Sequence, residues 1–218
     1  FRGHIVPQDG KLMPPMALSA DGDRLVVSSW FGAAVQVWDP RTDAAIEHYD
    51  MPLPLNAIRF QDDLVVADLV LGGVVWASDH GMVLPMDGEN VFLPVGLATG
   101  GERLWVGDWA TGIVWQLDFD GRALVSTAPV AFGLSQPEGM ALDLDGSLLV
   151  VETGTRQLSR IDLSTGAVSV VAAGLDVGIP ALEGMPPTWF FDGVAVGPSG
   201  AIYLSENGRN ALTRIVRR

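Results

Sequence analysis

The sequence contains no cysteine and a single lysine, Lys11. The absence of thiols excludes cysteine nucleophiles, disulfides and metal sites built on cysteine, and it leaves both an exported and a cytoplasmic protein open. The formal net charge is −13, so polyanions such as nucleic acids and anionic membrane surfaces are repelled. Small neutral molecules and cations are therefore the expected partners, and a protein partner stays open.

Long apolar runs and helical periodicity are also missing. No apolar run reaches 18 residues, whereas a membrane-spanning helix needs about 20. The 26 glycines and 14 prolines are spread along a chain of 218 residues that is 48% hydrophobic, which is typical of short strands joined by tight turns. We expect one domain over residues 1–218. Because the sequence starts at Phe1 rather than Met, a domain truncated at its N-terminus is the alternative.

One pattern occurs five times along the chain. Each copy has an apolar strand, a polar turn, a hydrophobic strand such as LVV or LLVV, a turn and a third strand, and four copies add a weaker fourth strand. Equivalent residues are 39, 40, 44 and 54 positions apart, and about 40 to 45 residues is the length of a four-stranded propeller blade. The sequence therefore predicts an all-β fold, a β-propeller with five visible repeats. The copies begin at Pro14, Pro54, Pro94, Pro137 and Phe191.

The number of blades has two interpretations. The N-terminal segment FRGHIV is similar to FDGRALV at residues 119–125, which forms the end of the third copy, and the fifth copy has no fourth strand of its own. In the first, the N-terminal strand completes the fifth blade, which closes the ring and removes exposed edges. In the second, the chain is most of a six-bladed propeller.

The residue at the start of each first strand is expected to point into one mouth of the central channel. Three of these five start positions carry side-chain oxygens. Two carboxylates and an amide are donors suited to Ca²⁺ or Mg²⁺, and a cation would relieve the repulsion between the carboxylates. The alternative is that these residues only form turns. The start positions are Pro15, Asn56, Val95, Glu138 and Asp192.

The phrases QPEGMALDLDGSLLVVETG and FFDGVAVGPSGAIYLSENG resemble repeats of the SMP-30, gluconolactonase and strictosidine-synthase-like propellers, which are related to NHL repeats. In the lactonase members, an Asp in a P-D-G-M phrase and an Asn in an earlier blade bind a divalent cation. The resemblance implies that Asp192 and Asn56 are such ligands, with Glu138 where the family often has Asp. The sequence departs from the family at Val95, which offers no ligand, and in lacking the family's first-blade Glu.

Three functions follow from this resemblance. The first is a divalent-cation-dependent hydrolase of a small lactone or ester, with Ca²⁺ preferred over Mg²⁺ and held by Asn56, Glu138 and Asp192. In that enzyme the cation polarises the carbonyl, and Glu138 or Asp192 acts as the general base. The second is a non-enzymatic, NHL-like binding propeller. The third is a metal-independent lyase or condensing enzyme similar to strictosidine synthase, in which Glu206 or Glu152 is the base.

Other polar and aromatic positions have simpler interpretations. The acidic residues that end the second strands are expected to bond nearby turn amides, and Trp38, Trp76 and Trp115 are expected to pack within blades. An insertion over residues 176–191 leads into Asp192, and it is either a lid or substrate wall, with Trp189 and Phe190 as contacts, or a packed loop. The acidic positions are Asp68, Asp108, Glu152 and Glu206.

Overall fold

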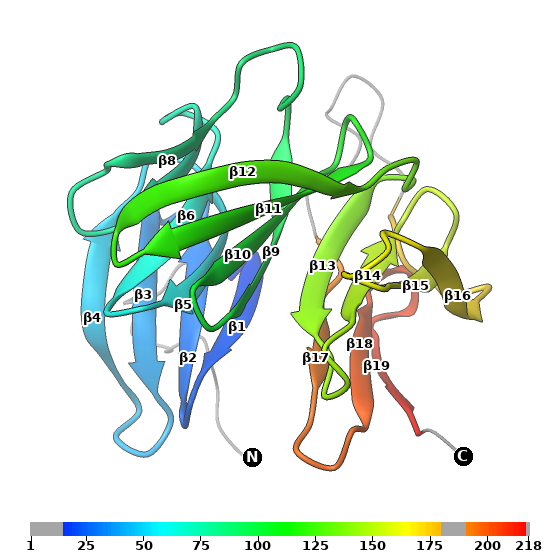
Figure 1. The fold of residues 1–218 in the computed structure, drawn as a ribbon. Helices are drawn as coiled ribbons and strands as arrows, with labels where there is room; N and C mark the ends of the chain where they lie inside the picture. The colour runs from blue at the N-terminus through cyan, green and yellow to red at the C-terminus, as the bar shows by residue number, and fades with distance from the viewer. Residues whose placement is uncertain (1–14, 180–190, 217–218) are drawn as a thin grey trace. The chain divides into compact units, whose positions relative to one another are not determined.

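The structure is a computed structural model that describes residues 15–179 and 191–216. Its contacts divide the chain into two compact units, unit 1 (Phe1–Met86) and unit 2 (Asp87–Arg218), which are described separately (Figure 1). Within the described residues, no helix has the length and apolar character needed to cross a bilayer. The predicted N-terminal strand, Trp189 and Phe190 lie outside the described residues.

Unit 1 contains two four-stranded antiparallel sheets in which consecutive strands are hydrogen-bonded neighbours. The hydrophobic runs identified in the sequence form the second strand of each sheet, and all six residues of Asp63–Asp68 are buried. Gly22, in the turn between the first two strands, has a φ of +59°, a conformation that suits glycine in a tight hairpin. The strands are β1 (Ala17–Asp21), β2 (Arg24–Ser29), β3 (Ala34–Asp39), β4 (Ala44–Asp50), β5 (Pro54–Phe60), β6 (Asp63–Asp68), β7 (Gly73–Trp76) and β8 (Met82–Pro85).

Unit 2 contains three antiparallel sheets of the same kind, two with four strands and one with three described strands. A 3₁₀ turn, η1 (Asn207–Arg209), connects β18 to β19 in the last sheet. The strands are β9 (Pro94–Gly100), β10 (Arg103–Asp108), β11 (Ile113–Asp120), β12 (Ala123–Ala131), β13 (Pro137–Leu142), β14 (Leu148–Glu152), β15 (Gln157–Ile161), β16 (Val168–Ala173), β17 (Val194–Val196), β18 (Ile202–Glu206) and β19 (Ala211–Ile215).

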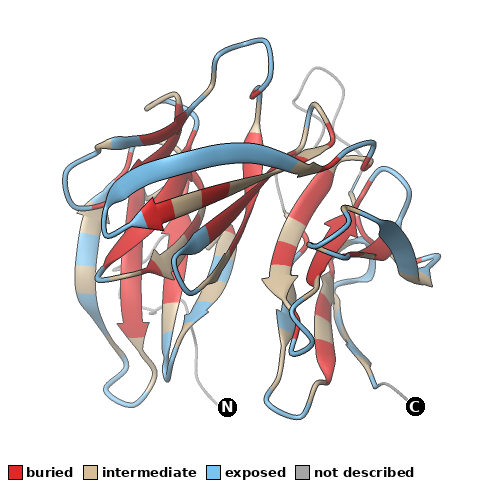
Figure 2. Ribbon diagram, in the orientation of Figure 1, coloured by how far each residue is buried: buried red, intermediate tan, exposed pale blue. Residues whose placement is uncertain are grey.

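Neighbouring sheets within each unit pack through their first strands. β1 contacts β5 in unit 1, and β13 contacts both β9 and β17 in unit 2. The buried residues are concentrated on the inner strands of each sheet, as Figure 2 shows in red. This is the way in which successive propeller blades build a shared apolar core.

Glycine allows β13 and the segment before β17 to approach closely. The Gly139 N–H donates to the Asp192 carbonyl oxygen at 2.9 Å. A Cβ at position 139 would lie 2.6 Å from that oxygen and 2.7 Å from the Cα of Gly193, so any larger residue would force the backbones apart. This contact places Glu138 beside Asp192.

The structure confirms the all-β fold and the blade-like organisation predicted from the repeat. Pro54, Pro94 and Pro137 are the first residues of β5, β9 and β13, and the four predicted fourth strands are β4, β8, β12 and β16. Trp38 and Trp76 are buried, and Trp76 stacks on Phe60 with ring centroids 5.8 Å apart. The packing role expected of these two tryptophans is therefore confirmed.

Candidate functional site

Glu138 is the second residue of β13 and is completely buried. The backbone N–H of Asp192 donates to its Oε2 at 2.7 Å. Its Oε1 is 3.1 Å from the hydroxyl of Thr153 and accepts the indole N–H of Trp109 at 3.3 Å. Groups from three separate segments therefore hold this carboxyl group in one orientation.

Asp192 is also completely buried, two residues before β17. The Gly178 N–H donates to its Oδ2 at 2.8 Å, and the Asn207 N–H donates to its Oδ1 at 2.8 Å. The side chain thus joins two segments to the start of β17, as a turn-forming residue would. A carboxylate has about four lone-pair sites, so two hydrogen bonds leave it able to accept more.

Thr153 can satisfy either protonation state of Glu138. Its single hydroxyl proton faces two acceptors, the Gln136 carbonyl oxygen at 3.1 Å and Glu138 Oε1 at 3.1 Å. If Glu138 is protonated on Oε1, it can donate to Thr153, whose hydroxyl then donates to Gln136. If Glu138 is ionised, the hydroxyl donates to it, because the Gln136 carbonyl oxygen also accepts the Thr153 backbone N–H at 3.2 Å.

Burial is the main cause of the pKa shifts in the pair. It raises the pKa of Glu138 to about 8, and the Asp192 carboxylate adds to the rise, whereas the hydrogen bonds from the Asp192 N–H, Thr153 and Trp109 oppose it. Burial also raises the pKa of Asp192 to about 6, and the charge of Glu206 contributes. At neutral pH Asp192 is mostly ionised and Glu138 mostly protonated, which provides an acid and a base in one buried site. A nearby cation would lower both pKa values.

The acidic residues that end the second strands have a structural role. Asp108 accepts four backbone N–H groups at 2.7 to 3.0 Å, two from residues 92–93 before β9 and two from residues 110–111 after β10. The three equivalent acidic residues each accept an N–H from the segment that connects the previous blade to their own blade. These bonds join Asp68 to Leu53, Glu152 to Ser135 and Glu206 to Asp176.

The turn role expected for these four residues is confirmed for Asp68 and Asp108, which accept the N–H groups of residues 70–71 and 110–111. Glu152 and Glu206 instead accept from the segment before their blade and from polar side chains, which makes them weak candidates for a catalytic base. Glu152 Oε1 accepts from Ser159 and Gln157. Burial favours a higher pKa for Glu206, but the hydrogen bonds from Thr213, the Asp176 N–H and Arg209 outweigh it and lower that pKa.

The start positions Asn56 and Val95 offer fewer possible ligand atoms than the two carboxyls. Asn56 is half-buried on β5, and its Oδ1 accepts the N–H of Ala57 at 2.9 Å. Val95 is buried on β9 and has no donor atom in its side chain. Asn56 belongs to unit 1, whereas Glu138 and Asp192 belong to unit 2, so the described contacts bring together the two carboxyls of the predicted set.

The sequence analysis missed Trp109 and Thr153. Each directly follows a residue that ends a second strand, Asp108 or Glu152, and Asn207, which donates its N–H to Asp192, follows Glu206 in the same way. The repeat alignment therefore contained a signal for these residues. The position one residue beyond the acidic cap reaches the start of the first strand of its own blade at Thr153 and Asn207, and of the next blade at Trp109.

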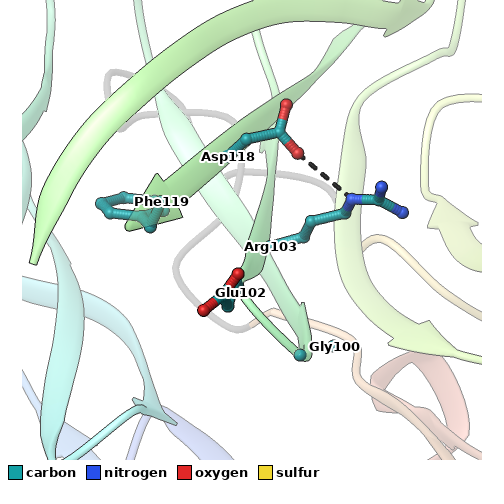
Figure 3. Close-up of a pocket in the computed structure, with 6 residues that line it drawn as sticks. Gly100, Glu102, Arg103, Asp118 and Phe119 are labelled. Atoms are coloured by element: carbon teal, nitrogen blue, oxygen red, sulfur yellow. Dashed lines mark hydrogen bonds and ion pairs between the residues drawn. The ribbon is translucent and has the colours of Figure 1, made fainter. Parts of the chain in front are cut away.

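Hollows on the surface of unit 2 lie at the other ends of the strands. One of about 330 Å³ is lined by residues 100–103 with Asp118 and Phe119, and the Arg103 Nε donates to Asp118 at 3.1 Å (Figure 3). A second of about 810 Å³ extends to residues 145–147 and 160–164. Neither includes Glu138 or Asp192. Over residues 15–179 and 191–216, no group of three or more His, Cys, Asp or Glu side chains is placed to hold a metal.

Comparisons with known proteins establish the fold. No family model matches the chain, and no curated protein sequence matches it significantly. A catalytically inactive variant of virginiamycin B lyase from Staphylococcus aureus, solved with quinupristin, aligns with a TM-score of 0.62 at 15% identity over 94% of this chain and 68% of that one.

Two further solved structures are similar. A streptogramin B lyase has a TM-score of 0.60 at 15% identity over 92% of this chain and 68% of that one. The WD40 β-propeller domain of Doa1 has a TM-score of 0.65 at 12% identity, and it covers 92% of this chain and 63% of that one. Because these neighbours include both enzymes and a WD40 propeller, the similarity identifies an architecture: the chain has a β-propeller fold.

Proposed function

We propose that this propeller is a hydrolase of small lactones or esters, related to the SMP-30 and gluconolactonase group, and that its chemistry takes place at Glu138 and Asp192. The observation that carries the proposal is the buried pair itself. The two residues are joined by the 2.7 Å bond from the Asp192 N–H to Glu138, and burial raises the pKa of both carboxyls. Isolated buried carboxyls are costly unless they are compensated, and strongly perturbed pairs are common in active sites.

The carboxyl pair fits a hard divalent cation, Ca²⁺ with Mg²⁺ as the alternative, and Glu138 and Asp192 would hold it. Both side chains offer carboxylate oxygens, which these ions prefer. Of about four lone-pair sites on each carboxylate, Glu138 uses three and Asp192 two. Both therefore retain capacity for a ligand. When bound, the cation would polarise the carbonyl of the substrate and stabilise the developing negative charge on its oxygen.

The proton transfers belong to the protein's own side chains. Asp192 has fewer hydrogen bonds than Glu138 and the lower pKa, so it is the general base that accepts a proton from the attacking water. The water oxygen bonds to the carbonyl carbon and the ring C–O bond breaks. The leaving alkoxide then takes a proton back from Asp192, giving a hydroxy acid. Trp109 and Thr153 keep Glu138 in place during these steps.

The test is lactone hydrolysis with and without a chelator, in the wild type and in Asp192→Asn and Glu138→Gln. Asn and Gln retain one acceptor oxygen for the backbone N–H groups, so folding is less affected than in Asp192→Ala. We expect a loss of activity of about 100-fold or more in both variants and in the chelated wild type. Asp118→Asn, which alters an exposed, ion-paired carboxylate at the other end of the strands, is the matched control and should keep the activity of its folded fraction. Equal activity with and without chelator, together with an active Asp192→Asn variant, would refute the metal hydrolase.

One alternative has a specific observation in its favour. A group with a pKa near 8, as for Glu138, suits acid–base catalysis without a metal, as in a lyase or condensing enzyme. Because Glu152 and Glu206 are occupied by hydrogen bonds, Glu138 would have to replace them as the base. Activity that survives chelation but is lost in Glu138→Gln would support this alternative. No activity on any substrate and no response to chelator would favour a binding propeller instead.

A further inference from the structure

Four large apolar side chains lie at the same end of unit 2 as the carboxyl pair. Phe92 is 49% exposed, Phe132 is 64% exposed and Ile179 is 39% exposed, and Trp109 is half-buried. They belong to four different segments, which precede β9, follow β10, follow β12 and follow β16. All four lie at the end of the unit where the first strands of its blades begin.

Hydrogen bonds connect two of these side chains to the pair. The Trp109 N–H donates to the Leu93 carbonyl oxygen at 2.8 Å, which holds the segment containing Phe92 against the turn after β10. The indole N–H of Trp109 reaches Glu138. Phe92 and Glu138 are therefore both neighbours of Trp109.

The other two side chains belong to segments that lead directly to the pair. Phe132 is six residues before Glu138 on the connection from β12 to β13. The Leu134 N–H fixes this connection by donating to the Gly112 carbonyl oxygen at 3.1 Å. Ile179 follows Gly178, whose N–H donates to Asp192. The four apolar side chains therefore belong to segments that are hydrogen-bonded to the pair or lead directly to it.

Exposed aromatic and aliphatic side chains that gather beside buried polar groups are typical of a ligand site. The four side chains carry no charge, and the chain as a whole has a net charge of −13, which disfavours anionic ligands. A polyhydroxylated lactone would need polar partners for its hydroxyls, and these four offer only the Trp109 N–H, which Glu138 already accepts.

We infer that the site takes an uncharged lactone or ester with an aliphatic chain or aromatic ring, which packs against Phe92, Trp109, Phe132 and Ile179. The inference rests on the proposed hydrolase function. It predicts that the apolar part of the substrate contributes most of the binding, since burying one aromatic side chain against a ligand is worth roughly 1.5–3 kcal/mol, or about 10- to 150-fold in affinity.

The experiment compares two six-membered lactones, δ-decalactone and δ-gluconolactone, in the wild type, the double variant Phe92→Ala/Phe132→Ala and the control Leu144→Ala. Leu144 is 65% exposed in the turn between β13 and β14, at the other end of the blade. We expect the wild type to prefer δ-decalactone. The double variant should lose at least tenfold in kcat/KM for that lactone and change less than twofold for δ-gluconolactone, and Leu144→Ala should change neither.

Preference for δ-gluconolactone, or equal losses on both lactones in the double variant, would overturn the inference while leaving the hydrolase intact. If neither lactone is hydrolysed, the hydrolase proposal fails, and binding of the neutral fluorophore N-phenyl-1-naphthylamine tests the apolar site separately. Saturable binding that is weakened at least tenfold in the double variant but retained in Leu144→Ala would support the apolar site. Binding that is absent, or equal in all three proteins, would overturn it.

Discussion

The buried Glu138 makes the stability of the cation-free protein depend on pH in an unusual direction. Its pKa is raised from an ordinary value of 4.5 to about 8, so folding favours the protonated form. This contribution is complete below about pH 4.5 and is lost as the pH rises through 8. A tenfold change in proton affinity corresponds to about 1.4 kcal/mol. The contribution is therefore at most about 5 kcal/mol, of which roughly 3 kcal/mol disappears between pH 5 and pH 8.

The assay is chemical or thermal unfolding of chelated protein between pH 5 and pH 8, with Glu138→Gln as the reference that cannot titrate. For a chain of this size, about 3 kcal/mol corresponds to a decrease of roughly 6 to 12 °C in Tm relative to the variant. Asp192, with its pKa raised to about 6, acts in the same direction at lower pH in both proteins. If the wild type and Glu138→Gln have the same pH dependence, Glu138 does not titrate as the structure indicates and the reasoning is wrong.

Three further predictions concern the cation and the backbone contacts around the pair. Calorimetry should show that Ca²⁺ binds more tightly at pH 8 than at pH 6, because the ion must displace the proton of Glu138; an affinity independent of pH would contradict this. Asp108→Ala leaves four backbone N–H groups without their acceptor and should reduce the free energy of unfolding by about 3 kcal/mol. The control Asp118→Ala, which removes an exposed, ion-paired carboxylate, should reduce it by less than about 1 kcal/mol. Gly139→Ala should destabilise the protein by more than about 2 kcal/mol, since its Cβ would lie 2.6 Å from a backbone oxygen. The control Gly193→Ala, whose Cβ would have its nearest contact at 3.7 Å, should destabilise the protein far less. Similar values for the two variants would argue against the close approach of β13 to the segment before β17.

The fold was largely predictable because each blade repeats the same local pattern of hydrophobic runs and turn residues. Hydrophobic runs between turn residues identify the second strands, and proline marks the beginnings of β5, β9 and β13. The alignment also predicted that Asp68 and Asp108 stabilise turns, because an acidic residue before a turn can accept the N–H groups that the turn leaves free. These features are local, so a single sequence contains them.

The candidate site was predictable only in part because its contacts are not local. Glu138 and Asp192 were found through their equivalent places in the repeat, but the sequence does not show that the N–H of one donates to the carboxyl of the other across 54 residues. Trp109 was missed because its contact with Glu138 depends on how adjacent blades pack, and Thr153 because its contact depends on how β13 and β14 pair within one blade. The predicted contacts of Trp189 and Phe190 with substrate, and the ligand role of Asn56, remain predictions.

The proposed hydrolase depends on a divalent cation held by Glu138 and Asp192. The most direct measurement is a crystal structure of the protein grown with Ca²⁺, with anomalous scattering used to identify the ion. We expect an anomalous peak with carboxylate oxygens of both residues at about 2.3–2.6 Å. Well-defined side chains at Glu138 and Asp192 with no ion between them at saturating Ca²⁺ would contradict it.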